Sequence, residues 1–220
     1  MRVGVVLAAG ASRRMGRPKP LVQIAGQTFL VRSVRRLWGA CDAVVVVLGS
    51  AAHEVQRSIE REFERIVASS RVSRDLKSRH RARRLEARFL VHARWRRGML
   101  SSVQAGLSAA LELRAHAILV MPVDQPSVRP ATVGAVAGAM EAALAAYRGG
   151  GAKRSRFAYA LIPRHRRRRG HPIAVSAALA RAIAIDRGAT DLSDAVRRNA
   201  RLIGYLDVTD PGVVQNRNRG

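Results

Sequence analysis

The stretch of this chain with the clearest chemical potential is a loop of small and basic residues near its beginning. It reads Leu7-Ala8-Ala9-Gly10-Ala11-Ser12-Arg13-Arg14-Met15-Gly16-Arg17-Pro18-Lys19. Small residues at 8–11 let the backbone approach a ligand, so that several N–H groups can point together at an anion. Arg13 or Arg14, and then Lys19, add charge that can neutralise phosphate oxygens. The loop predicts a phosphate site, and the alternative is an ordinary turn with incidental arginines.

A single aspartate, Asp124, follows a strongly apolar run and precedes Pro126 in a chain poor in carboxylates. Mg²⁺ prefers one or two carboxylates together with waters and substrate phosphate, so a lone aspartate suits it. The alternative is a turn or N-cap aspartate before the helix expected at about 130–146. Position alone does not separate the two interpretations. The phosphate loop itself matches neither a dinucleotide fingerprint nor a Walker loop.

The elements that must position these residues alternate between strands and helices. Apolar runs predict strands at 2–7, 43–48, 89–91, 117–121, 157–162, 172–175 and 202–206. Apolar periodicity predicts helices at about 27–38, along Val55, Ile59, Phe63 and Ile66, at 101–113, at about 130–146, from near Ser176 and near 191–199. This alternation predicts an α/β fold with three layers, in which helices cover both faces of a mostly parallel sheet. Ligands bind at the carboxyl ends of such strands, where both loops lie.

Composition favours one domain over residues 1–220, with a basic insert at about 69–88 and solvated loops at 148–156 and 164–169. The 40 Lys and Arg against 15 Asp and Glu give a net charge of +25, which attracts nucleic acid and nucleotides without a specific site. The lone Cys41 and the absence of a signal or spanning segment indicate a cytoplasmic protein without a membrane. Histidine and cysteine spacing indicates no zinc site.

The ordered pattern Leu-Ala-Ala-Gly-x-Ser-x-Arg-Met-Gly-x-Pro-Lys resembles the signature of the MobA-like nucleotidyltransferases, closest to their molybdenum cofactor cytidylyltransferase branch. Three further segments keep the order of that family: Trp95-Arg-Arg-Gly-Met-Leu-Ser-Ser-Val-Gln-Ala-Gly-Leu107, Met121-Pro-Val-Asp-Gln-Pro126 and Arg169-Gly-His-Pro172. The resemblance implies a nucleotide-diphospho-sugar transferase-like, Rossmann-type fold. It covers most of the chain, apart from 69–88 and the far C-terminus.

The resemblance also implies roles for particular residues. Catalytic roles fall to Lys19, Arg14 and Asp124, with Asp124 holding Mg²⁺. Nucleotide-binding roles fall to Leu7, Ala8, Ala9, Gly10, Ser12, Gly98, Ser101 and Ser102, and acceptor-binding roles to Arg169 and His171. The implied reaction transfers CMP from CTP to the phosphate of molybdopterin and releases pyrophosphate. The family's usual second acidic ligand is replaced near the C-terminus, so that Asn218 or Asn216 would have to serve.

Other functions stay open on the sequence alone. A neighbouring enzyme of the same family would use a sugar or alditol phosphate as its acceptor. The charge of +25 and the arginines between 71 and 97 suggest a non-catalytic nucleic-acid-binding protein as an alternative. Against it, only 4% of residues are aromatic, so few side chains could stack on bases. A member with an altered C-terminus could also bind a nucleotide without turning it over.

Overall fold

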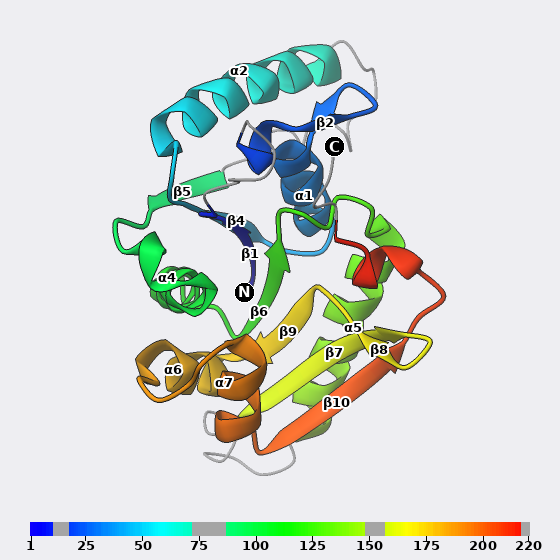
Figure 1. Ribbon diagram of the computed structural model, residues 1–220. Coiled ribbons are helices and arrows are strands. Elements are labelled where there is room, and N and C mark those ends of the chain that lie inside the picture. Colours follow the sequence, from blue (N-terminus) through cyan, green and yellow to red (C-terminus); the bar gives the residue numbers. More distant parts are fainter. Residues whose placement is uncertain (11–17, 72–86, 148–156, 217–220) are drawn as a thin grey trace.

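The computed structural model describes residues 1–10, 18–71, 87–147 and 157–216 (Figure 1). Ser12 and Arg14 of the predicted phosphate loop lie outside the described residues, and so does Asn218. Most of the predicted basic insert, from residue 72 to residue 86, also lies outside them.

An eight-stranded sheet forms the centre of the molecule, in the order β10-β7-β9-β6-β1-β4-β5 with β8 paired to β7. Its strands are β1 (Arg2–Ala8), β4 (Ala43–Leu48), β5 (Ala87–Val91), β6 (Ala117–Pro122), β7 (Tyr159–His165), β8 (Arg168–Arg169), β9 (Ile173–Ser176) and β10 (Leu202–Asp207). Strands β5, β4, β1 and β6 are parallel to one another, whereas β9 runs antiparallel to both of its neighbours. The predicted mostly parallel sheet is therefore confirmed.

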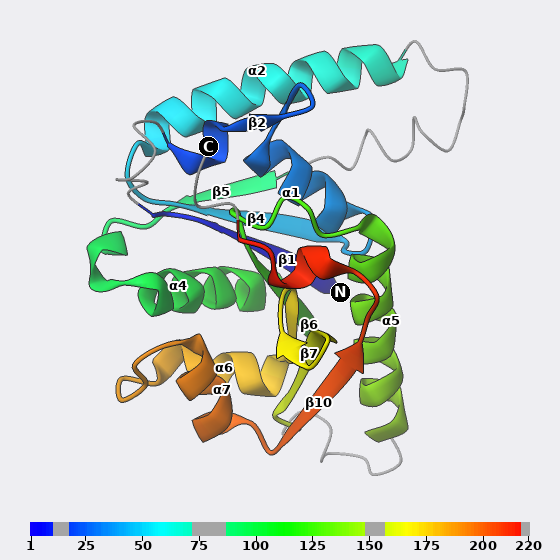
Figure 2. The same cartoon turned by 45° about the vertical axis from the view of Figure 1, so that its right-hand side comes forward.

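Helices cover the sheet in two groups (Figure 2). One face carries α1 (Phe29–Trp38), α2 (Ala52–Arg71) and α5 (Pro130–Ala146), and the other carries α4 (Met99–Glu112), α6 (Ala177–Ile185) and α7 (Leu192–Asn199). Short 3-10 turns are η1 (Lys19–Leu21), η2 (Trp95–Arg97) and η4 (Pro211–Val214), and a small hairpin pairs β2 (Gln23–Ile24) with β3 (Gln27–Thr28). The three-layer α/β fold is thus the one predicted.

Side-chain alternation along the central strands explains why the sheet needs helices on both faces. In β1, Val5 packs into the core beneath α4, whereas Val6 packs into the core beneath α1 and α5. Both side chains are fully buried, and β4 and β6 follow the same pattern. Each valine side chain that is buried in this way, on either face of the sheet, stabilises the fold by about 1.5–3 kcal/mol. A strand that is apolar on both faces therefore specifies the middle layer.

The strand order reverses between β1 and β6. From β1 the chain passes outward to β4 and then to β5, after which β6 returns to the other side of β1. At such a switch point, the loops that leave the carboxyl ends of two adjacent strands diverge and leave a crevice. The loop after β1 carries Lys19, and the loop after β6 carries Asp124.

One loop prediction needs correction. Residues 164–169 were expected to be a solvated loop, but β7 continues to His165 and turns tightly into β8. Arg166 and Arg167 make this turn with positive φ angles of 49° and 63°. The segment is exposed from 166 to 169, as its charge suggested, yet it is paired as a hairpin. The sequence does not predict a strand here, because consecutive arginines lack the alternation of apolar and polar residues that is typical of strands.

None of the helices in the described ranges is long and apolar enough to span a membrane.

Candidate active site

Lys19 and Asp124 meet beyond the carboxyl ends of β1 and β6, although they lie 105 positions apart in the chain. Pro18 precedes the η1 turn that carries Lys19, and the lysine Nζ lies 3.4 Å from Oδ2 of Asp124. Their side chains are 23% and 22% exposed, so both groups are shielded from bulk water and still open to a ligand. The structure thus brings together the cation and the carboxylate that the sequence singled out.

The helix-cap interpretation of Asp124 is wrong. Helix α5 begins after Arg129, whose own side chain makes no capping hydrogen bond. Asp210 takes that role, because its Oδ2 accepts a hydrogen bond from the Arg129 backbone N–H at 2.8 Å and from the Thr132 hydroxyl at 2.7 Å. Asp124 instead lies in the turn that follows β6. Its carboxylate is therefore not committed to the helix terminus.

Asp210 also fastens the C-terminal segment to the loop that follows β6. Its Oδ1 accepts a hydrogen bond from the Gly212 backbone N–H at 2.9 Å, and Gly212 packs directly against the backbone of Ser127. Farther along, Oδ1 of Asn216 accepts a hydrogen bond of 2.8 Å from Nε2 of Gln125. Gln125 is the neighbour of Asp124 and is only 3% exposed. The structure therefore places the Asn216 carboxamide next to the loop that carries Asp124.

His171 also lies near the carboxyl end of β6, but it comes from the segment before β9. It stands just before β9, which is antiparallel to β6, so the start of β9 lies beside the carboxyl end of β6. Burial lowers the pKa of its imidazole to about 4, and the nearby negative charge of Asp124 only partly opposes this shift. Nδ1 is buried and has no hydrogen-bond partner among the described residues. His171 is thus neutral near pH 7 and has hydrogen-bonding capacity to offer.

The backbone around His171 is held tightly. Its N–H donates to the carbonyl of Val213 at 3.0 Å, and the N–H of Gly170 donates to the carbonyl of Pro163 at 2.8 Å. A Cβ atom at Gly170 would collide with the Val213 carbonyl, so only glycine permits this approach. Close packing against Val213 thus explains the glycine in the Arg-Gly-His-Pro segment.

Arg169 lies apart from His171. Its guanidinium Cζ is 5.5 Å from the centroid of the Tyr205 ring on β10, and that of Arg164 is 4.6 Å from the same centroid. Arg164 also makes a paired hydrogen bond to the carboxylate of Asp207. These contacts direct Arg169 toward the outer strands of the sheet, whereas His171 lies near enough to Asp124 for the carboxylate charge to raise its pKa.

The predicted nucleotide loop begins as a tightly packed segment. Ala8 and Ala9 are buried, Leu7 is 8% exposed, and Gly10 is exposed. The Gly10 carbonyl accepts a hydrogen bond of 3.0 Å from the Ser50 hydroxyl, which ties the loop after β1 to the loop after β4. Gly49 packs so closely on the Ala9 carbonyl and the Trp95 side chain that a Cβ atom would collide with both.

The start of α4 is the second predicted nucleotide segment. Gly98 has a φ of 102°, which favours glycine, and provides no side-chain cap. The Ser101 hydroxyl donates to the Gly98 carbonyl at 2.8 Å and lies 3.1 Å from Nε2 of His92. Ser102 is 4% exposed and faces inward. Ser101 is therefore the better placed of the two hydroxyls to meet a ligand.

The donor set fits a magnesium ion that is held mainly through water and substrate. Within the described ranges, no group of three or more His, Cys, Asp or Glu side chains could hold a metal ion. Asp124 provides one partly exposed carboxylate, and Gln125 has a buried Oε1 without a partner. Mg²⁺ commonly takes one or two carboxylates and completes its shell with waters and phosphates. A closed protein cage is not needed for that coordination.

The three-layer α/β sheet has the nucleotide-diphospho-sugar transferase-like fold, with a basic residue and a carboxylate side by side at its switch point. Residues 4–202 match the MobA-like NTP transferase domain family. The chain belongs to this family and is a nucleotidyltransferase of the MobA-like type.

The similar proteins differ in the activities that their names state. Over 214 residues the chain is 34% identical to the nicotine blue oxidoreductase of Paenarthrobacter nicotinovorans, with 94% of this chain and 87% of the relative covered. It is 31% identical over 132 residues to a probable molybdenum cofactor guanylyltransferase of Opitutus terrae, with 60% and 52% covered. A manganese complex of Rv0371c from Mycobacterium tuberculosis H37Rv is 23% identical, with a TM-score of 0.59 and 94% and 88% covered.

Sequence reasoning missed the roles of Asp210 and Gln125. Asp210 stands before Pro211, a signal for capping the short η4 turn, which it does. Its second role, on α5, depends on a contact across 81 positions that no local pattern encodes. Gln125 belongs to the Met121–Pro126 segment that resembles the family, but its hydrogen bond to Asn216 spans 91 positions.

Proposed function

We propose that this protein transfers CMP from Mg-CTP to the phosphate of molybdopterin and releases pyrophosphate. The observation that carries the proposal is the approach of Lys19 to Asp124 at the switch point of the sheet. A carboxylate can hold Mg²⁺ beside substrate phosphates, and a cation can offset the phosphate charge. The choice of CTP and of molybdopterin is supported by the motif resemblance in the N-terminal loop.

The reaction follows from charge and position. One phosphate oxygen of the acceptor attacks the α-phosphorus, a new P–O bond forms, and the bond between the α-phosphorus and the α–β bridging oxygen breaks. The departing pyrophosphate takes that electron pair. Lys19 offsets the negative charge on the triphosphate, and Asp124 is the residue that would hold Mg²⁺. When bound, the ion neutralises phosphate charge and so favours attack by an anion.

An anionic phosphate nucleophile carries no proton that must be removed before it attacks. The site therefore needs no general base, in keeping with the buried, uncharged imidazole of His171 nearby. Transfer then depends on the alignment of the acceptor oxygen with the leaving group, which is a task of positioning.

Pyrophosphate release, measured with Mg²⁺, molybdopterin and each of CTP, GTP, ATP and UTP, tests the proposal. We expect release with CTP and little with the other three. Release with GTP alone would be consistent with the mechanism but would reject the preference for cytosine as the nucleobase. Release with CTP only when a sugar or alditol phosphate replaces molybdopterin would reject the acceptor, and no release from a folded protein with any pair would reject the proposed function.

A second candidate function comes from the similarity to nicotine blue oxidoreductase, which extends over 94% of this chain. The absorbance of nicotine blue, followed with a soluble two-electron donor, tests it on the same preparation. Turnover of the dye without any nucleotidyl transfer would favour this second function over the first.

Asn216 offers a direct test of the metal requirement. Replacement of its carboxamide by a carboxylate, Asn216→Asp, would keep an acceptor for Gln125 and add a charged oxygen near Asp124. We expect the Mg²⁺ concentration for half-maximal transfer to fall about tenfold, because Mg²⁺ prefers charged oxygen ligands. Gln215→Glu adds the same charge one residue earlier, at an exposed position, and should leave the Mg²⁺ dependence unchanged. Equal shifts in both variants would indicate a general charge effect.

A further inference from the structure

A cleft of about 850 Å³ opens between the first half of α4 and the loop that joins α6 to α7. Its walls come from the segment after β5, from one side of α4 and from residues 184–190. Lys19, Asp124 and His171 do not line it. The cleft is therefore separate from the Lys19–Asp124 pair, although it shares Ser101 with the predicted nucleotide segment at the start of α4.

The lining of the cleft is cationic and rich in hydroxyl groups. Arg94, Arg97 and Arg187 supply three exposed guanidinium groups, none of which forms an ion pair within the described part of the chain. Ser101 and Thr190 add hydroxyl groups. Guanidinium groups bind phosphate through paired, charge-assisted hydrogen bonds, and hydroxyls complement them.

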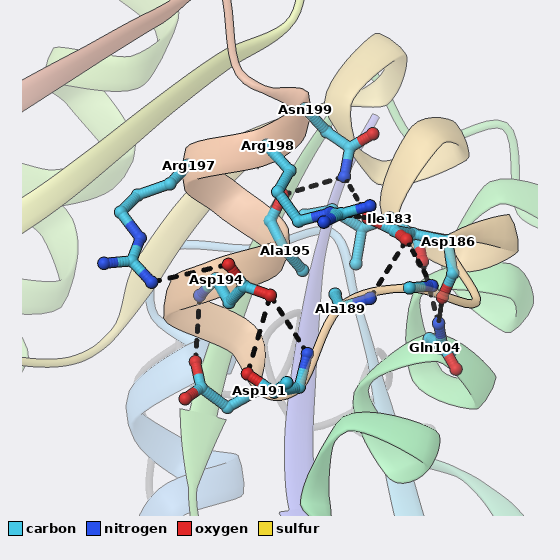
Figure 3. Close-up of polar contacts among 12 residues, drawn as sticks. Gln104, Ile183, Asp186, Ala189, Asp191, Asp194, Ala195, Arg197, Arg198 and Asn199 are labelled. Atoms are coloured by element: carbon cyan, nitrogen blue, oxygen red, sulfur yellow. Dashed lines mark hydrogen bonds and ion pairs between the residues drawn. The ribbon is translucent and has the colours of Figure 1, made fainter.

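The one carboxylate in the lining is already committed (Figure 3). Asp186 accepts hydrogen bonds from the backbone N–H groups of Gly188 and Ala189 at 2.8 and 3.1 Å, and from Nδ2 of Asn199 at 2.6 Å. Its side chain is 9% exposed and also pairs with Arg198. The negative charge is thus turned into the loop, away from a ligand in the cleft.

The same loop is fastened to α4 across the cleft (Figure 3). Nε2 of Gln104 donates to the backbone carbonyls of Ile183 and Asp186, at 3.0 and 2.7 Å. One carboxamide thus joins the two walls, while the Asp186 contacts fix the fold of the loop. A cleft whose walls are already held in place binds a ligand with less ordering cost.

Apolar side chains line the space between the charged groups. Leu100, Ala105 and Ala184 are partly buried, and Ile185, at the end of α6, is 80% exposed. Clefts of this size hold whole small molecules rather than a single ion. A ligand that satisfies both kinds of surface carries a phosphate group and a ring of modest polarity.

We propose that this cleft is a second binding site, distinct from the Lys19–Asp124 pair, for a phosphomonoester that carries a ring. Arg94, Arg97 and Arg187 bind its phosphate, and the apolar wall of α4 and α6 receives its ring. Two sources have this chemistry: the phosphorylated acceptor of the transfer reaction, and a phosphorylated effector that is not consumed.

Calorimetric titration of the full chain with 1-naphthyl phosphate, in 150 mM salt with EDTA, tests the site. We expect saturable binding that weakens at least tenfold in the triple variant Arg94→Gln, Arg97→Gln, Arg187→Gln. The matched control, Arg35→Gln, Arg57→Gln, Arg201→Gln, removes three exposed arginines from other elements and should change the affinity less than twofold. Equal losses in the two triple variants would mean attraction by net charge alone and would overturn the proposal.

A second variant keeps every charge and fills the space. Ser108 is exposed on α4 and lines the cleft, so Ser108→Trp should abolish binding of 1-naphthyl phosphate while circular dichroism remains that of the wild type. Unchanged binding in this variant would overturn the proposal. Displacement of bound 1-naphthyl phosphate by saturating Mg-CTP would also overturn it, because the cleft would then not be a separate site.

Inhibition of the transfer reaction distinguishes the two sources. Competition of 1-naphthyl phosphate against the acceptor would identify the cleft as the acceptor site, whereas inhibition independent of acceptor concentration would identify an effector site. If no transfer activity exists, the binding measurements still decide the proposal, because they use neither nucleotide turnover nor metal.

Discussion

Asp124→Asn is expected to reduce pyrophosphate release about a thousandfold, which corresponds to about 4 kcal/mol of transition-state stabilisation. The amide has nearly the shape of the carboxylate but cannot supply its charge to Mg²⁺ or to Lys19. Initial rates at saturating Mg-CTP and acceptor measure this loss. The fold should survive, because a partly exposed ion pair with a 3.4 Å separation contributes less than about 1 kcal/mol.

The control for this variant is Asp42→Asn. Asp42 is exposed, accepts a hydrogen bond from the backbone N–H of Arg2, and lies at the opposite end of β4 from the crevice. Its rate should equal that of the wild type within experimental error. If Asp124→Asn also kept the wild-type rate, Asp124 would have no role in holding the metal, and the proposed centre would be wrong.

The fold could be predicted closely because its signals are local. The run from Ala43 to Leu48 is apolar at every position and forms β4 with those same bounds. Thr28, Ser176 and Asp191 each cap the helix that begins at the next residue, and each side chain accepts a hydrogen bond from a backbone N–H three positions later. Caps of this kind appear in the sequence because donor and acceptor are neighbours.

The site could be predicted only in part. Lys19 and Asp124 were both identified, since each follows an apolar strand and the fold class alone puts the ends of parallel strands on one edge. Two contacts could not be predicted, because each joins segments about 80 to 90 positions apart: the capping of α5 by Asp210 and the hydrogen bond between Gln125 and Asn216. Arg169 and His171 stand two residues apart in one motif, yet the β7–β8 hairpin sends Arg169 toward Tyr205. A motif conveys the order of residues but not the directions of their side chains.

Asp210→Ala is expected to lower the free energy of unfolding by about 3 kcal/mol. The side chain is 4% exposed, and its removal leaves the N–H of Arg129, the Thr132 hydroxyl and the N–H of Gly212 without their acceptor. Loss of a helix cap costs about 1 kcal/mol, and buried donors left unsatisfied cost about 1–3 kcal/mol more. Urea unfolding near pH 7 measures the change.

Asp207→Ala provides the matched control. Asp207 also pairs with an arginine, Arg164, but its side chain is 68% exposed, so its loss should cost less than about 1 kcal/mol. Equal destabilisation by the two variants would show that Asp210 does no more than a surface carboxylate. Transfer activity should also fall in Asp210→Ala and not in Asp207→Ala, because Asp210 holds the segment that brings Asn216 to Gln125.

The stabilisation by Asp210 should also depend on pH in a definite direction. Burial favours the protonated acid, but the hydrogen bonds from Arg129, Thr132 and Gly212 outweigh burial and lower the pKa of this carboxyl below its ordinary value. The unfolded chain therefore binds the proton first as the pH falls. The stabilisation is complete above the unfolded pKa of about 3.9 and is lost as the pH falls through the lower folded pKa. The difference in unfolding free energy between wild type and Asp210→Ala should hold from about pH 7 to pH 5 and narrow below about pH 4. A difference that widened on acidification would mean that the neutral acid, rather than the carboxylate, makes these bonds.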